Sequence, residues 1–256
     1  MTGRDPCFKR TEDEVLHDTT VTGPVNGPGS FDAALLDLFG TLVDFRSVFV
    51  GTLRRILVEN GLIGQEDEFR GRWQSFVFQG AAEGAFVTVR EDFIDSLVRV
   101  LGDLGVEGDL RGYSDDVIGS MFEDLRRARL FPEVPEVIEG LDAAGVPWAV
   151  VSNVDEDDLR TIMTNHGLRP VVSVSSERVR SYKPHAGPFI AALEELDLSA
   201  ERVIHAGDSP LADVKGAADL GMGTYWVNRY DMEYPGDLPE PGWTARDLRV
   251  LPSLFR

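Results

Sequence analysis

An aspartate, Asp37, ends the apolar run of residues 33–36, and a glycine follows it closely at position 40. Such a run predicts a buried strand, and the glycine predicts a turn directly after it. Ligands of open α/β sheets bind beyond the carboxyl ends of the strands. A carboxylate in that place can attack phosphorus or carbon and form a covalent intermediate, which divides one difficult step into two easier ones. Asp37 is therefore the candidate nucleophile.

Three later segments repeat the design of an apolar strand with a polar tip. Ser152 and Asn153 end the run that starts at residue 148, and Lys183 stands before a proline at the end of residues 179–183. Asp208 ends the run of residues 202–207, and Asp213 follows five residues later. We expect Asp37 and Lys183 to lie on adjacent strand tips, with Asp208 and Asp213 available to a metal ion.

The four segments, in this order, resemble the motifs of the haloacid dehalogenase-like (HAD) hydrolase superfamily. That superfamily has a nucleophilic Asp strand, a Ser or Thr strand, a lysine, and a Gly-Asp strand with a second acid four or five places on. The resemblance covers residues 33–228 and implies a doubly wound parallel α/β sheet of the Rossmann-like kind. It also implies a Mg²⁺ ion held by Asp37, the backbone carbonyl of Phe39 and Asp208, with Asp213 binding directly or behind these ligands. Mg²⁺ prefers such oxygen donors.

The same resemblance assigns roles to the remaining polar residues. Lys183 would neutralise charge on Asp37 and on the substrate, and Ser152 and Asn153 would donate hydrogen bonds to a phosphoryl oxygen or a substrate carboxylate. Thr41 would satisfy local backbone groups or a carboxylate of the metal site. Plainer readings stay open for single residues: a Ser-Asn pair also forms ordinary turns and helix caps. An acid in a first helical turn, as at Asp213, is favoured by the helix dipole alone.

Phe39 departs from the phosphatase pattern, which usually has a second aspartate there as general acid and base. An aromatic residue at this place resembles the haloacid dehalogenases proper, whose halide leaves unprotonated. Those enzymes, however, replace the acid at position 208 by serine, have asparagine where this chain has Pro210, and have tyrosine where it has Phe189. The favoured function is a Mg²⁺-dependent phosphatase for a small phosphorylated metabolite. The alternatives are dehalogenase-like hydrolysis at carbon and a catalytically weak HAD-fold binding protein.

The elements that position these residues fall into two parts. Between the first and second motifs, apolar residues recur at three and four spacing over residues 45–60, 66–79, 91–104 and 114–129, which predicts helices. An all-helical insert at this point resembles the cap of many HAD enzymes. We assign residues 46–129 to the cap and residues 31–45 and 130–256 to the core, with hinges near 44–46 and 129–132. Arg54, Arg72, Trp73 and Phe76 are candidates for selecting the substrate.

Helix and strand patterns alternate through the second half of the chain. Strands are predicted at residues 148–151, 171–174, 203–206 and 224–227, and helices at 135–145, 155–167, 185–196 and 209–221. Such alternation is typical of parallel βαβ units. The histidines His166, His185 and His205 show no triad or metal spacing, so we interpret them as structural.

Composition limits the possible partners and location. The 25 basic and 44 acidic residues give a net charge of −19, which argues against nucleic acid as a partner. A small anionic substrate must then meet a local cation or a metal. No apolar stretch approaches the length of about 18 residues that a membrane span needs. Residues 1–30, which include the sole cysteine Cys7, are expected to form a disordered leader and no secretory signal, in a cytoplasmic protein.

Overall fold

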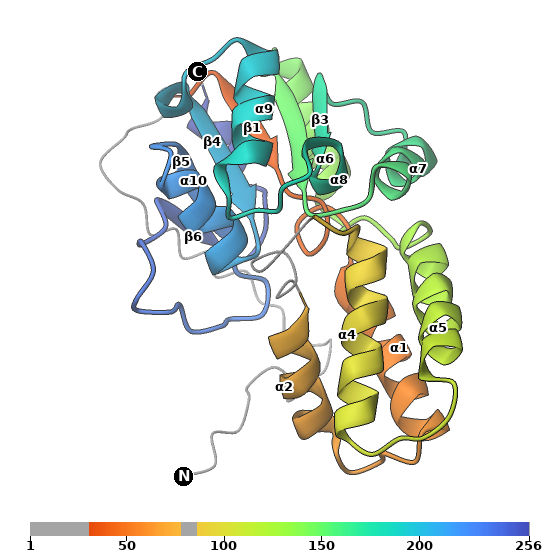
Figure 1. Ribbon diagram of the computed structural model, residues 1–256. Helices are drawn as coiled ribbons and strands as arrows, with labels where there is room; N and C mark the ends of the chain where they lie inside the picture. Colours follow the sequence, from red (N-terminus) through yellow and green to blue (C-terminus); the bar gives the residue numbers. More distant parts are fainter. Residues whose placement is uncertain (1–30, 78–85, 256) are drawn as a thin grey trace.

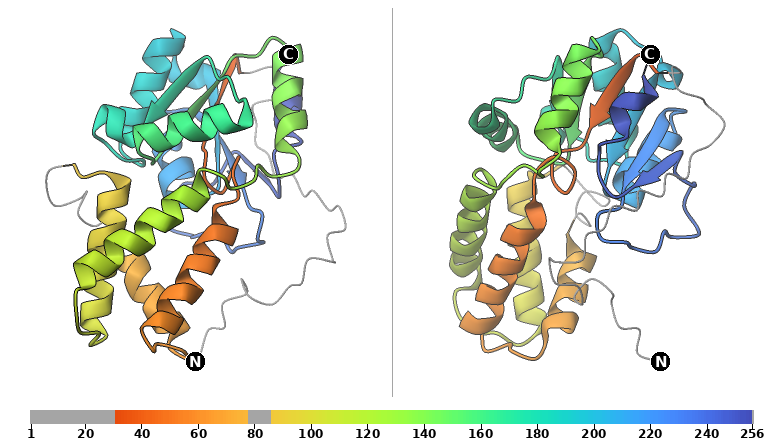
Figure 2. Two further views of the ribbon diagram at one scale, coloured as in Figure 1. Left: turned by 90° about the vertical axis from the view of Figure 1, so that its right-hand side faces the viewer. Right: turned by 180° about the vertical axis from the view of Figure 1, so that it is seen from behind.

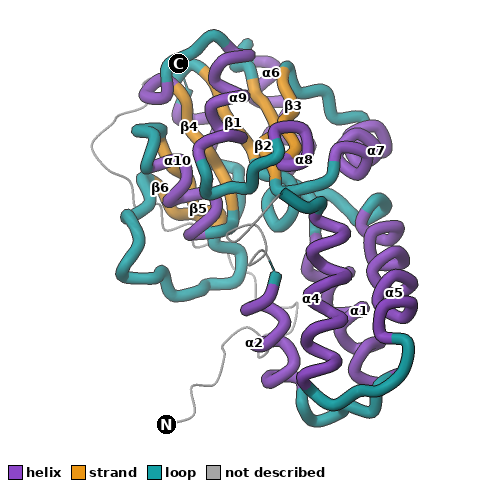
Figure 3. The backbone as a smooth tube through the Cα atoms, viewed as in Figure 1, coloured by secondary structure: helices purple, strands orange, loops and turns teal. Residues whose placement is uncertain are grey.

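The computed structural model describes residues 31–77 and 86–255. The predicted leader, with Cys7, and the last two residues of the helix predicted at 66–79 lie outside the described residues. Figure 1 shows two parts, a sheet sandwiched by helices and a group of helices without strands. Figure 3 shows the same division by secondary structure.

The first part is built on a parallel sheet, as predicted. Its described strands are β1 Ala33–Leu36, β2 Trp148–Ser152, β3 Val172–Ser175, β4 Val203–Gly207, β5 Gly223–Val227 and β6 Trp243–Ala245. Their order is β3-β2-β1-β4-β5-β6, and every pair is parallel. The strand order therefore reverses at β1, which places the end of β1 at the switch point where such sheets bind ligands.

Helices cover both faces of the sheet. They are α6 Val134–Ala143, α7 Glu156–His166, α8 Ser176–Val179, α9 Ala186–Leu196 and α10 Gly216–Ala218, with 3₁₀ turns η2 Ala200–Arg202 and η4 Leu251–Leu254. Because strand side chains alternate, Ala34 and Leu36 pack with α6 and α7 on one face, whereas Ala33 and Leu35 pack with α9 on the other. Strands buried on both faces explain the continuous apolar runs of the sequence.

The second part consists of four described helices between β1 and α6. They are α1 Phe45–Glu59, α2 Glu66–Phe76, α4 Val89–Asp103 and α5 Leu110–Leu125. The side chains of Asp44, Thr88 and Asp109 accept hydrogen bonds from first-turn amides and so cap α1, α4 and α5. These helices bury a hydrophobic cluster of their own, distinct from the two beside the sheet.

Two connections join the helical part to the sheet part. They run antiparallel and pair with each other: the amide of Asp44 donates to the carbonyl of Arg129 at 2.9 Å, and that of Phe131 to Leu42 at 3.0 Å. Both connections pass through the narrow junction that the two views of Figure 2 show. The paired residues, 42–44 and 129–131, adjoin the ranges 44–46 and 129–132 at which hinges are expected.

Some elements differ from expectation. The helix predicted at 209–221 is a π-helical turn, η3 Pro210–Lys215, continued briefly by α10. The helix α5 begins at Leu110, four residues before the predicted start, because Asp109 caps it. The strand β6 and the short α8 were not predicted. Among the described helices, none has both the length and the apolar character needed to cross a membrane.

Candidate active site

The candidate nucleophile lies at the carboxyl edge of the sheet, one residue beyond β1. Ser152 at the end of β2 donates from Oγ to Asp37 Oδ1 at 2.9 Å, and Lys183 donates from Nζ to the same oxygen at 2.7 Å. Both bonds go to Oδ1, so Oδ2 is the oxygen available for attack. Burial raises the pKa of Asp37 above its usual value, against the opposing effect of Lys183. The structure brings the three predicted catalytic residues into direct contact.

The ammonium group of Lys183 donates to three acceptors, one of which is Asp37. The same group also donates to Asp213 Oδ1 at 2.6 Å and to the carbonyl of Val151 at 2.8 Å. Burial alone would lower the pKa of Lys183, but the charges of Asp213 and Asp37 raise it. A buried ammonium group with two carboxylate partners stays charged, so it can stabilise negative charge on Asp37 and on a group bound beside it.

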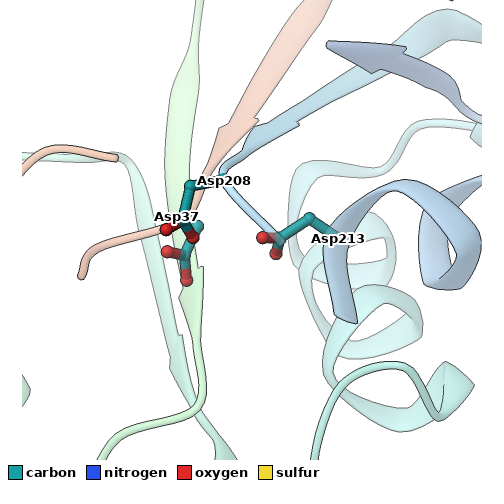
Figure 4. A group of neighbouring side chains, drawn as sticks. All are labelled: Asp37, Asp208 and Asp213. Carbon is teal, nitrogen blue, oxygen red and sulfur yellow. The ribbon is translucent and has the colours of Figure 1, made fainter. Parts of the chain in front are cut away.

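Asp37, Asp208 and Asp213 form a carboxylate cluster with ligand atoms within 4.8 Å of one another. Figure 4 shows the three side chains converging from β1, β4 and η3. Burial, and then the charges of Asp37 and Asp213, raise the pKa of Asp208 well above its usual value. For Asp213 burial acts in the same direction, but Lys183 and His205 together outweigh it and hold the pKa of Asp213 below the usual value.

This donor set fits a divalent metal ion. When all three carboxylates are ionised, one ammonium group leaves two negative charges without a cation among these four groups. Asp213 already forms hydrogen bonds with Lys183, His205 and the amide of Ser209. The carboxylate of Asp208 instead lies beside Gly40, in the loop after Asp37. Hard oxygen donors with excess negative charge are what Mg²⁺ requires. Asp37 and Asp208, with the nearby carbonyl of Phe39, are the residues suited to hold it, and Asp213 positions Lys183.

The turn after Asp37 depends on Gly40. This residue has a φ of +83°, and a Cβ built on it would lie 2.1 Å from Oδ2 of Asp208. The chain therefore needs glycine for two reasons, a left-handed backbone and the close approach of a carboxylate.

Arg229, which the sequence analysis missed, anchors the same turn from the end of β5. It donates from Nε to the carbonyl of Gly40 at 3.0 Å and from Nη2 to that of Thr41 at 2.6 Å. Its guanidinium group also pairs with the buried Glu133 at 2.7 Å and lies over the ring of Phe131. Its position just beyond a strand was the only sign in the sequence that Arg229 could reach the site. No local pattern connects it to Gly40 and Thr41, almost 190 positions earlier.

His205, interpreted as structural, contacts Asp213 from the side away from the cavity lining. Its Nε2 is 2.9 Å from Oδ1 of Asp213, and Phe189 packs edge-on against its ring. Burial lowers the pKa of His205, which favours the neutral ring. A neutral imidazole can donate one hydrogen bond to Asp213 and so hold it in place. His166 and His185 lie elsewhere, the former bonded to the carbonyl of Ala128.

Asn153 and Thr41, two of the predicted substrate ligands, do not contact Asp37 in the way that Ser152 does. The side-chain amide of Asn153 bonds both backbone groups of Lys183, at 2.7 and 3.0 Å, so it fixes the lysine loop. Thr41 is buried, and its hydroxyl has no hydrogen-bond partner among the described residues. Asn153 borders the cavity above Asp37, whereas Thr41 does not.

A cavity of about 460 Å³ opens directly over Asp37, between the sheet and the helices. Its floor holds Asp37, Ser152, Lys183, Asp208 and Asp213, and its walls are mainly rings: Phe39, Phe45, Phe49, Trp73, Phe93 and Phe122. Of the four candidates for substrate selection, Trp73 lines the cavity. Arg72 pairs with Glu68, Phe76 packs under Arg99, and Arg54 is exposed.

Two loops of the site also touch the helical part. The carboxylate of Asp155, three residues after Ser152, accepts hydrogen bonds from the amides of Val89 at 2.6 Å and Arg90 at 3.0 Å. The hydroxyl of Tyr182, next to Lys183, donates to the carbonyl of Val87 at 2.7 Å. The start of α4 and the residues just before it are thus bonded to segments that adjoin Ser152 and Lys183, which both contact Asp37.

Comparison with known proteins finds dehalogenases and phosphatases similar to this chain. A family model described as haloacid dehalogenase-like hydrolase matches residues 31–221. The chain is 22% identical to haloacetate dehalogenase H-2 of Moraxella sp. (strain B), over 88% of this chain and 97% of that protein. It is 28% identical to an N-acetylmuramic acid 6-phosphate phosphatase of Pseudomonas putida, over 83% and 89%. The solved structure of L-2-haloacid dehalogenase from Xanthobacter autotrophicus superposes with a TM-score of 0.70 at 22% identity, over 88% and 98%.

Proposed function

Since the chain belongs to the haloacid dehalogenase-like hydrolases, as its four motifs predicted, we propose that it hydrolyses a small organic phosphomonoester with the help of Mg²⁺. The observation that carries this proposal is Asp208, a third, partly buried carboxylate beside the buried Asp37 and Asp213. A metal-free site for an anionic substrate gains nothing from that additional charge. Among the relatives, the Pseudomonas putida protein is named as a phosphatase.

The chain's own residues supply most of the proposed mechanism. Asp37 Oδ2 attacks phosphorus, the bond to the ester oxygen breaks, and an aspartyl phosphate and an alkoxide or aryloxide result. Water then attacks the aspartyl phosphate, releasing inorganic phosphate and restoring Asp37. Lys183 and Ser152 hold Asp37 in one orientation and oppose the negative charge of the phosphoryl group. Mg²⁺, when bound to Asp37 and Asp208, supplies further positive charge beside that group.

Phe39 determines which esters react fastest. Its ring cannot donate a proton, so the leaving oxygen must take one from water. General acid catalysis contributes about 10²–10⁴-fold in rate. We therefore expect faster turnover of esters with acidic leaving groups than of simple alkyl esters.

Hydrolysis of 2-haloacids is the second candidate function. It is favoured by Phe39, because halide leaves without a proton, and by the names of several relatives. The substrate carboxylate would need a cation, and Lys183, the one described cation lining the cavity, already bonds two carboxylates.

One assay separates the two candidates. Phosphate release from phosphomonoesters and halide release from 2-haloacids are measured in parallel, with Mg²⁺ and with EDTA. We expect phosphate release that EDTA abolishes and no halide. Asp37→Asn should abolish turnover, whereas Asp197→Asn, an exposed control at a left-handed backbone position that asparagine accepts, should not. Full halide release in EDTA would refute the phosphatase proposal.

A further inference from the structure

A row of aromatic rings leads from the nucleophile into the helical part. Phe39 lies against Phe45 with ring centroids 5.8 Å apart, Phe45 stacks on Phe49 at 5.4 Å, and Phe49 stacks on Trp73 at 5.2 Å. The last two pairs are nearly parallel, with interplanar angles of 24° and 26°. The rings therefore form a continuous apolar wall that begins two residues after Asp37.

The wall borders open space as well as other side chains. All four rings line the cavity over Asp37. Trp73 is 1% exposed, and its indole N–H donates to Ser96 Oγ at 2.9 Å, which removes its polar atom from use by a ligand. The polar lining side chains lie on the floor, apart from Gln74, which is exposed near the end of α2.

Among the described residues, no cation other than Lys183 lines this cavity. Three arginines of the helical part have other partners: Arg90 lies over the ring of Phe122 and pairs with Asp158, Arg99 lies over Phe76, and Arg72 pairs with Glu68. The floor already holds three carboxylates. A second anionic group on a ligand would thus meet negative charge and apolar walls, where an unpaired charge is strongly disfavoured.

We propose that the group esterified to the phosphate is uncharged and apolar, with an aromatic ring or comparable bulk that packs against Phe45, Phe49 and Trp73. This inference rests on the proposed phosphatase function and narrows its substrate class. Sugar phosphates and carboxylated phosphates are excluded as good substrates, because a hydroxyl-rich or acidic group would lose its hydration against carbon walls. A cavity of about 460 Å³ lies in the range of pockets that enclose ring-containing ligands.

Binding of non-hydrolysable phosphonates tests the inference without requiring turnover. Calorimetry at saturating Mg²⁺ compares 2-(1-naphthyl)ethylphosphonate, ethylphosphonate and phosphonoacetate, which share the phosphonate group. Burying an aryl group should improve affinity by about 10²-fold over ethylphosphonate, from the apolar area removed from water. Phosphonoacetate should bind no better than ethylphosphonate. Equal affinities, or tighter binding of phosphonoacetate, would overturn the inference.

Turnover of the matching esters distinguishes this failure from failure of the function. Phosphate release from ethyl phosphate without a preference for the naphthylethyl ester would leave the phosphatase proposal intact and refute the apolar substrate class. Aryl preference in binding without phosphate release from any ester would refute the phosphatase proposal and leave the apolar ligand class intact.

A charge placed in the wall gives a second test. Phe49→Arg should remove most of the aryl preference and improve phosphonoacetate binding at least 10-fold, by giving its carboxylate a partner. The control Val58→Arg adds the same charge to the same helix at a position that is 58% exposed and outside the cavity. It should leave all three affinities unchanged. An effect of Val58→Arg as large as that of Phe49→Arg would refute a specific role for the wall.

Discussion

Arg229 has two roles that substitutions can separate: its ion pair with Glu133 contributes to stability, and its hydrogen bonds to Gly40 and Thr41 position the turn after Asp37. Arg229 and Glu133 pair at 2.7 Å with side chains only 9% and 3% exposed. In Arg229→Met, Glu133 becomes a buried charge without that partner, which costs about 3–5 kcal/mol of unfolding free energy. The carbonyls of Gly40 and Thr41 also lose charge-assisted hydrogen bonds.

The double variant Arg229→Met/Glu133→Leu removes both charges at once. Replacing a buried ion pair by apolar groups is often neutral for stability, so we expect the double variant to regain about 2–3 kcal/mol over Arg229→Met. Its kcat/KM for phosphate release should nevertheless stay at least 10-fold below that of the parent. The turn that carries Phe39 and Gly40 still lacks its anchor, and small displacements at a reaction centre reduce rates strongly.

Urea denaturation gives the stability, and initial rates at saturating Mg²⁺ give the activity. Arg249→Met is the control, because Arg249 forms an exposed pair with Asp247 and such pairs contribute about 0–1 kcal/mol. An Arg229→Met protein within 1 kcal/mol of the parent, or a double variant no more stable than the single one, would refute the electrostatic part. Parental kcat/KM in the double variant would refute the positioning role.

Three further perturbations address the turn and the metal site. Phe39→Asp should raise turnover of alkyl phosphates at least 10-fold and change p-nitrophenyl phosphate little, because it adds the missing proton donor; no gain in a folded protein at saturating Mg²⁺ would mean that the site is not arranged for phosphoryl transfer. Asp208→Asn should weaken Mg²⁺ binding in calorimetry at least 10-fold, and unchanged affinity would remove Asp208 from the metal site. Gly40→Ala should lose about 1–2 kcal/mol and most Mg²⁺ affinity, since its Cβ meets Asp208, whereas the control Gly61→Ala, with a φ of +66° and open space, should lose stability only. Equal Mg²⁺ affinity in both glycine variants would contradict the clash.

Strand tips could be predicted because their signals are local. The apolar runs before Asp37, Ser152 and Asp208 define buried strands, and a parallel sheet brings their carboxyl ends to one edge. The contact of Lys183 with Asp37 followed from the motif order and not from any pattern around the lysine. Helices with clear apolar spacing, such as α1 and α4, lie close to their predicted ranges.

The missed features depend on partners that are remote in sequence. Arg229 looks like an ordinary surface arginine until the sheet places it beside Gly40. His205 sits in an apolar strand, and only the turn η3 brings Asp213 back to it. A π-helical turn has the same composition as an α-helical one, so the apolar spacing could not distinguish them. The strand β6 has three residues, too few for an alternation to be read.

Asp155 accepts hydrogen bonds from the amides of Val89 and Arg90, and Tyr182 donates one to the carbonyl of Val87. Through these bonds, the surroundings of Asp37 and the position of the start of α4 are energetically coupled. A ligand that binds more tightly when these hydrogen bonds to the start of α4 are formed must stabilise the bonded arrangement by the same factor. The amides of Val89 and Arg90 are the donors in this junction, so their protection from hydrogen exchange should rise when the cavity is filled. Occupancy of the cavity could then be followed from the backbone, without a reaction and without a label on the ligand.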